Sequence, residues 1–223
     1  MHIEPGLVDG AKITLSYTTS AAAGATGLWF ARHALQERGM MSLAVRSLTA
    51  AVLTFFFFEV LPTFPVGVSE VHFILGSTLF LILGAGPSAI GLTLGLLVQG
   101  FFFSPSDLPQ FGMNLTTLLL PLFALTALAR RLIAPGTAYV DLKYSQVLAL
   151  SACYQGGVVA WVAFWAIYGM GSEALAPVGT FALAYLAVIV LEPLADLAVL
   201  AAAKALRDKT PPALVEPRLY APA

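Results

Sequence analysis

The chain carries very little charge. Only 10% of its 223 residues are Asp, Glu, Lys or Arg, whereas roughly a quarter is usual in soluble domains. So few charged side chains cannot cover a surface that faces water. In contrast, 59% of the residues are hydrophobic and the mean hydropathy is +0.87. The composition therefore predicts an integral membrane protein. The net charge of -1, without a basic patch, predicts no binding to nucleic acid.

Several chemical motifs are also absent from the sequence. The single cysteine, Cys153, excludes an internal disulfide and a cluster of thiolate metal ligands. No glycine is followed by lysine, so the chain has no phosphate-binding P-loop and we do not expect it to hydrolyse ATP. Catalytic motifs of the HExxH and GxSxG types are missing too. We therefore expect no enzyme activity.

Long apolar runs fill most of the chain. Because roughly 20 apolar residues cross a bilayer as a helix, we predict an all-α, polytopic membrane bundle of about seven helices. It forms one domain over residues 1–205, and the proline-rich tail, 206–223, is expected to be disordered. The third and fourth segments are short, so they are either two short spans or a hairpin that does not fully cross. The predicted helices are 12–36, 40–61, 70–84, 86–103, 112–132, 144–169 and 177–204.

The basic residues predict an orientation. Lysine and arginine gather around the first connection, around 133–143 and after the last helix. The alternate connections, 62–69, 104–111 and 170–176, contain neither. Positive charge marks the cytoplasmic side. We therefore predict an outer N-terminus and a cytoplasmic C-terminus.

The second residue of the chain is one of only three histidines. No signal-peptide pattern precedes it, and initiator methionine is normally removed only before a small residue, so we expect a free amine on Met1. That amine, together with the amide and imidazole nitrogens of His2, can close adjacent chelate rings on one metal ion. His72 lies on the same predicted outer side and would add a fourth nitrogen. Such donors suit Co²⁺, Ni²⁺ or Cu²⁺.

A metal-bound histidine usually needs a hydrogen-bond partner on its other ring nitrogen. The polar residues that we expect to support the site come from the connection 62–69 and from three predicted helices. They are Ser69, Glu70, Gln99 and Asn114.

Three stretches of the sequence resemble one family of membrane proteins. Met1-His2-Ile3 followed by Gly6 resembles the start of the CbiM/NikM group. The segment from Pro65 to Gly76 is similar to that family's small-residue loop ending in a histidine, and 97–114 to its glutamine-to-asparagine stretch. The group comprises the substrate-capture (S) components of cobalt and nickel energy-coupling-factor (ECF) transporters, a class of ABC importer. The resemblance covers residues 1 to about 205.

The resemblance implies a function and partners. Met1, His2 and His72 would hold Co²⁺ or Ni²⁺ as the transported substrate, without an organic cofactor. A membrane coupling (T) subunit, two cytoplasmic ATPases and a small accessory membrane subunit would complete the importer in a bacterial cytoplasmic membrane. Cobalt uptake would feed cobalamin biosynthesis. The histidine-rich loop expected after the fourth helix is Ser104–Gln110 here, which leaves the choice between cobalt and nickel open.

Two readings from other classes stay open beside metal capture. The chain would be a metal-dependent intramembrane enzyme if a metal with an open ligand position activated water. It would be a scaffold membrane protein if the Met1-His2 sequence were a coincidence.

Two acids lie within the last predicted helix. Glu192 and Asp196 are four residues apart and therefore share one helix face. Acids at membrane depth are costly and functional by default. They line an ion path, contact a partner or form a polar bundle interior; we favour a structural role near the cytoplasmic end.

Small residues fill the segment from Ser20 to Gly27 in the first predicted helix. Small side chains let helices approach closely. This face either packs within the chain's own bundle or, as the resemblance implies, docks the coupling subunit.

Overall fold

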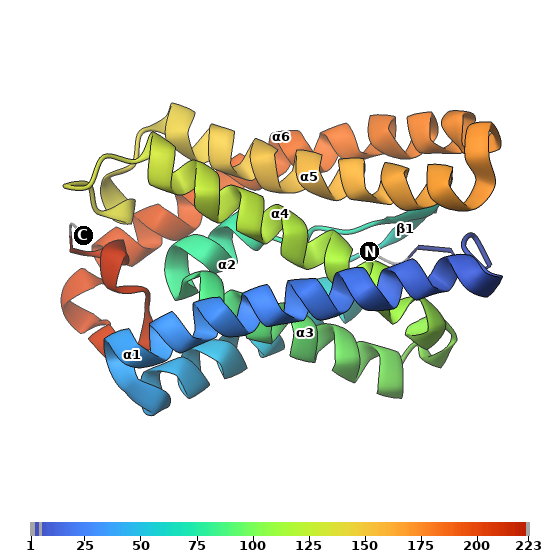
Figure 1. Ribbon diagram of the computed structural model, residues 1–223. Helices are drawn as coiled ribbons and strands as arrows, with labels where there is room; N and C mark the ends of the chain where they lie inside the picture. The colour runs from blue at the N-terminus through green and yellow to red at the C-terminus, as the bar shows by residue number, and fades with distance from the viewer. Residues whose placement is uncertain (1–2, 5, 222–223) are drawn as a thin grey trace.

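The computed structural model describes residues 3–4 and 6–221 as a helical bundle (Figure 1). In that part of the chain a two-stranded hairpin is the only sheet. Helices α5 and α6 run side by side along one side of the bundle, α1 and α3 form the other, and the short α2 lies inside (Figure 1). The main elements are α1 (Ile13–Glu59), β1 (Phe64–Val66), β2 (Ser69–Val71), α2 (Gly76–Leu83), α3 (Ala85–Phe102), α4 (Phe111–Leu132), α5 (Tyr144–Met170) and α6 (Leu175–Ala205).

Single turns of 3-10 helix join or follow these elements. They are η1 (Gly10–Lys12), η2 (Pro105–Gln110), η3 (Tyr139–Asp141), η4 (Gly171–Ala174), η5 (Arg207–Lys209), η6 (Pro212–Leu214) and η7 (Pro217–Leu219).

Four stretches of helix are long and apolar enough to cross a membrane: Gly10–Glu59, Ala85–Phe102, Pro105–Leu132 and Tyr144–Ala205. The first contains a break at Gly39, where φ is 78° and ψ is 175°. Residues that carry a side chain rarely adopt such a backbone conformation, so glycine permits a reversal of chain direction here. The last stretch contains both α5 and α6, separated by η4. These breaks match the boundaries predicted between 36 and 40 and between 169 and 177.

The segment 70–84, predicted either as a short span or as part of a hairpin that does not fully cross, is helical only in part. The segment begins as strand β2, continues without regular secondary structure, and becomes helical only over the 8 residues of α2. Its apolar sequence reflects burial within the protein rather than contact with lipid, because every residue from Gly76 to Leu81 is buried. Surrounding helices shield the non-helical backbone, which lipid cannot satisfy.

Two ends of the bundle are defined by contacts between distant segments. At the N-terminal end, Ile3 pairs with Ser69 in an isolated bridge, and Lys12 Nζ donates a hydrogen bond to the Gly169 carbonyl at 2.8 Å. At the C-terminal end, Lys204 pairs with Asp141 at 2.7 Å. Residues 72–83 lead from the first end to the second. The number of membrane crossings and the direction in which the bundle is inserted stay predictions.

The C-terminal strap, residues 211–221, differs from the expected disordered tail. Val215 and Leu219 are buried, and Arg218 donates a hydrogen bond to the Ala134 carbonyl at 2.7 Å. Tyr220 donates from its hydroxyl to the Ala203 carbonyl at 2.9 Å. Proline limits the freedom of an unfolded segment, so a proline-rich strap loses little entropy when it packs.

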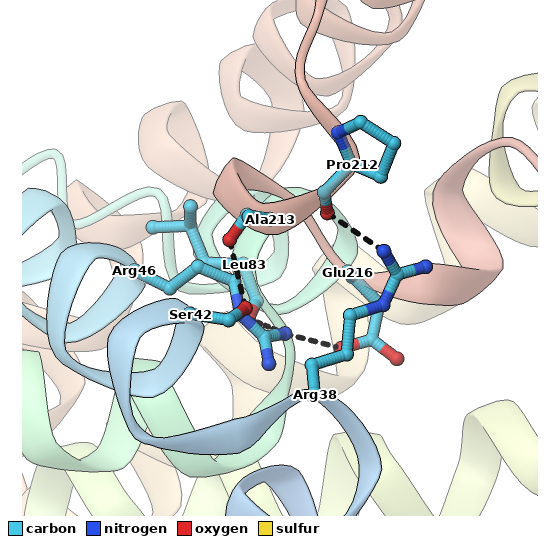
Figure 2. A network of polar contacts seen from close by, with 7 residues as sticks. All are labelled: Arg38, Ser42, Arg46, Leu83, Pro212, Ala213 and Glu216. Carbon is cyan, nitrogen blue, oxygen red and sulfur yellow. Dashed lines mark hydrogen bonds and ion pairs between the residues drawn. The ribbon is translucent and has the colours of Figure 1, made fainter.

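Figure 2 shows how the strap meets α1. Arg38 and Ser42 donate hydrogen bonds to the carbonyls of Pro212 and Ala213, at 2.9 and 2.7 Å. The fully buried guanidinium of Arg46 donates to the Leu83 carbonyl at 3.0 Å and pairs with Glu216 at 3.2 Å. The strap therefore supplies the counter-charge of a cation buried between α1 and the end of α2.

Candidate metal-capture site

The first described residue of the chain is anchored inside the bundle. Ile3 is 0% exposed, and its N–H donates a hydrogen bond to Asn114 Oδ1 at 2.9 Å. It pairs with Ser69 of β2, and the Glu4 N–H donates to the Val68 carbonyl. Ile3 also joins Val8 and residues of α4 and α5 in a separate apolar cluster. The N-terminal segment is thus held between the hairpin and the start of α4.

His72 lies directly after the strand that pairs with Ile3. Its side chain is 1% exposed, and its Nε2 lies 2.9 Å from Glu70 Oε2. The ring of Phe58 packs edge-on against it at 5.3 Å between centroids, and the Tyr185 hydroxyl donates to its carbonyl oxygen at 3.4 Å. Glu70 and Phe58 therefore hold the imidazole from two different elements, and Tyr185 of α6 holds the backbone of His72.

A groove opens beside His72 between the hairpin and α6. It has a volume of about 330 Å³. Its walls are almost entirely apolar, and His72 is the polar residue among those that line it. The lining residues include Phe64, Val71, Phe73, Val188 and Leu191.

The sequence-predicted residues fall into two groups. Ser69, Glu70, His72 and Asn114 lie together through their links to Ile3 and to each other. Gln99 is buried near the end of α3, and nothing described joins its side chain to His72. Met1 and His2 lie outside the described residues.

Sequence reasoning missed three residues that shape the site. Ile3, Phe58 and Tyr185 anchor the N-terminal segment or hold His72. Their signal was weak, because an isoleucine, one phenylalanine of a run of four and a helical tyrosine all fit ordinary packing. Only the fold brings them to the histidine.

The charged groups outside the apolar segments show local effects. Lys204 donates a hydrogen bond to Asp141 and lowers the pKa of that exposed carboxyl group. Burial raises the pKa of Tyr139 to about 12, and Glu216 adds to this effect. Both groups lie at the C-terminal end, away from His72, so they do not contribute to metal capture.

Comparisons with known proteins agree on the fold and family. A solved structure described as a truncated transition metal transporter has a TM-score of 0.64 to this chain at 15% identity, covering 94% of this chain and 99% of the other. At that identity the similarity shows a shared fold. A search of curated proteins finds no match. The sequence profile of the family described as "Cobalt uptake substrate-specific transmembrane region" matches residues 2–210. The chain, a transport protein of the membrane, therefore belongs to the CbiM family.

Proposed function

We propose that the chain is the substrate-capture subunit of an ECF-type ABC importer for Co²⁺ or Ni²⁺. The ion binds at the outer end of the bundle to the Met1 amine, the His2 nitrogens and His72. The observation that supports this most is the anchoring of Ile3 by Asn114 and Ser69, because His2 directly precedes Ile3 in the sequence. The anchored Ile3 supports this ligand set, because it lies beside the hairpin that leads to His72.

The contact between His72 and Glu70 supports a role for each ring nitrogen of His72 in this proposal. Glu70 occupies Nε2, so a metal ion would bind through Nδ1. A carboxylate on the distal nitrogen fixes the ring and makes it a better donor. Asn114 and Ser69 support the site by holding Ile3, and Gln99 remains a supporting residue proposed from the sequence.

Transport requires further chains. With no P-loop in its sequence, the subunit depends on a coupling (T) subunit and two cytoplasmic ATPases, with a small accessory membrane subunit where one is present. We place it in a bacterial cytoplasmic membrane with the N-terminus outside. Exposed Ala21, Ala22 and Ala25 of α1 offer a flat face for the coupling subunit, whereas Ala23 and Gly27 pack within this chain.

The test is calorimetric titration of metal-free, detergent-purified protein with Co²⁺ and Ni²⁺, using a C-terminal tag. Intact mass first establishes that Met1 is retained with a free amine. We expect one ion per chain, lost when an alanine is inserted between Met1 and His2 and weakened at least about 100-fold in His72→Ala, since each removes a nitrogen donor.

Two matched controls separate ligand loss from damage to the fold. An alanine inserted after the exposed Gly136, and His33→Ala at an exposed histidine on α1, should leave binding unchanged. Equal binding by the N-terminal insertion variant would refute the proposed ligand set. The ion bound more tightly would identify the substrate, cobalt for cobalamin biosynthesis or nickel.

A further inference from the structure

Two carboxyl groups are buried in the middle of the bundle, where α6 meets the start of α2. Glu192 is 0% exposed and Asp196 is 1% exposed. Ser77 Oγ lies 3.0 Å from Glu192 Oε1 and 2.6 Å from Asp196 Oδ2. Thr78 donates a further hydrogen bond to Asp196. The acids therefore face inward onto hydroxyl groups and away from lipid.

The pair has no cationic partner in the described part of the chain. The ion pairs found there join other acids, Glu216, Glu70 and Asp141. Two carboxyl groups in such surroundings are costly unless a cation or protons neutralise them. Hydroxyl groups alone do not supply that charge.

Helix α5 adds a second, independent observation. Gln155 is 0% exposed and lies beside Glu192, yet neither atom of its amide forms a well-oriented hydrogen bond with the described residues. Glu192 Oε2 and the Tyr154 hydroxyl are likewise without partners there. Each such atom destabilises the fold when it stays unsatisfied, so native interiors fill these places with water or an ion.

The chain geometry connects this cluster to His72. From His72 the backbone runs without regular secondary structure to Leu75, which adopts a left-handed conformation with φ of 54°, and α2 then begins at Gly76, next to Ser77. The Tyr154 ring packs so closely on Gly76 that no side chain would fit there. In transporters, interrupted helices of this kind hold ions inside the bundle, away from lipid.

We propose that Glu192, Asp196, Ser77, Thr78 and Gln155 form a second, intramembrane site for a divalent cation, located inward of His72. Two carboxylates, two hydroxyls and an amide carbonyl provide oxygen donors, and two negative charges balance one divalent ion. Oxygen donors hold Co²⁺ and Ni²⁺ less tightly than a nitrogen chelate and suit harder ions better. An ion released from the outer end would therefore pause here on its way inward.

The test uses Mn²⁺, which prefers oxygen ligands, and follows its binding by electron paramagnetic resonance in the detergent-purified full chain. Two samples remove competition from the outer end: His72→Ala protein, and unaltered protein preloaded with one equivalent of Ni²⁺. We expect one Mn²⁺ per chain in both. Glu192→Gln and Asp196→Asn should each weaken it by at least about tenfold.

Matched variants guard against a trivial loss of fold. Glu173→Gln and Asp208→Asn change exposed acids in the same way and should leave Mn²⁺ binding unaltered. Gln155→Leu keeps both acids and should weaken binding as well.

The proposal is overturned if the Ni²⁺-preloaded, unaltered chain binds no Mn²⁺, or if Glu192→Gln and Asp196→Asn both bind it normally. Failure of the outer site would appear differently, as Ni²⁺ binding that survives His72→Ala. The two results are therefore independent.

Discussion

Glu216 joins the C-terminal strap to a buried cation. Its carboxyl group pairs with Arg46, and its N–H donates to the Ile82 carbonyl at 2.7 Å. Gly84 lies so close to the carboxyl group that a side chain there would overlap it. Burial raises the pKa of Glu216 from 4.5 to about 7; Glu37 adds to the rise, and Arg46 opposes it.

This shift predicts how stability depends on pH. In the unfolded chain Glu216 titrates near 4.5, so between 4.5 and about 7 the folded chain binds more protons. The free energy of unfolding therefore falls as pH rises through this window, by at most about 3.5 kcal/mol at about 1.4 kcal/mol per pH unit. Glu216→Gln should remove this contribution and make the slope shallower, measured as the thermal unfolding midpoint at a series of pH values.

Glu173→Gln, an exposed acid at the opposite end, serves as the control and should keep the slope of the unaltered protein. Glu216→Gln imitates the protonated carboxyl group, so above about pH 7 it should be at least as stable as the unaltered protein. An unchanged slope in this variant would contradict the assignment.

At the scale of single residues, sequence reasoning was strongest where chemistry is restricted to few side chains. With three histidines in the chain, His72 stood out, and its neighbour Glu70 followed from the need for a ring partner. The link from Asn114 to Ile3 could not be read from the sequence, because the two residues are 111 positions apart.

Among the elements, α2 differs most from expectation. Hydropathy cannot distinguish a segment surrounded by lipid from one surrounded by protein, because both exclude water. The hairpin from Phe64 to Val71 and the left-handed Leu75 determine where this helix begins. Neither produces a helical period in the sequence, so the boundary at Gly76 was not predicted.

Helices α1 and α3 pack through glycine. A side chain at Gly91 would lie 2.2 Å from the Ala50 Cβ and 2.7 Å from its backbone. Gly91→Ala must therefore push the two helices apart, and we expect a loss of unfolding free energy on the order of 1–3 kcal/mol. Denaturant or thermal unfolding in detergent measures it.

Gly156→Ala in α5 is the matched control, because no other atom of the described residues lies within 4 Å of the added carbon. Alanine is the better helix former, so this variant should be as stable as the unaltered protein or slightly more so. Equal destabilisation of both variants would show that close α1–α3 packing is not the cause.

For the whole molecule, the predicted orientation can be tested with the single native cysteine removed. In a Cys153→Ala background, a cysteine at exposed Ser172 lies at the N-terminal end, and one at exposed Asp208 at the other. If the N-terminus is outside, a membrane-impermeant maleimide added to intact cells should label only the first. Labelling of Asp208→Cys alone would show that the orientation is opposite to the predicted one.

The bundle as a whole was predictable because composition and loop charge act over the full length of the chain. The predicted boundaries of α3 to α6, and the predicted break near Gly39, rest on long apolar runs that end in polar or glycine-containing turns. The strap was not predictable, since its order depends on Arg38, Ser42 and Arg46, which lie some 170 residues earlier.

The strap also gives the protein an order of assembly. Arg46 is synthesised 170 residues before its counter-charge at Glu216. Until then the nascent bundle contains a buried cation without its ion-pair partner. A chain that stalls or is cut before the strap would thus carry a built-in defect at its C-terminal end, which membrane proteases can recognise before any transporter is assembled.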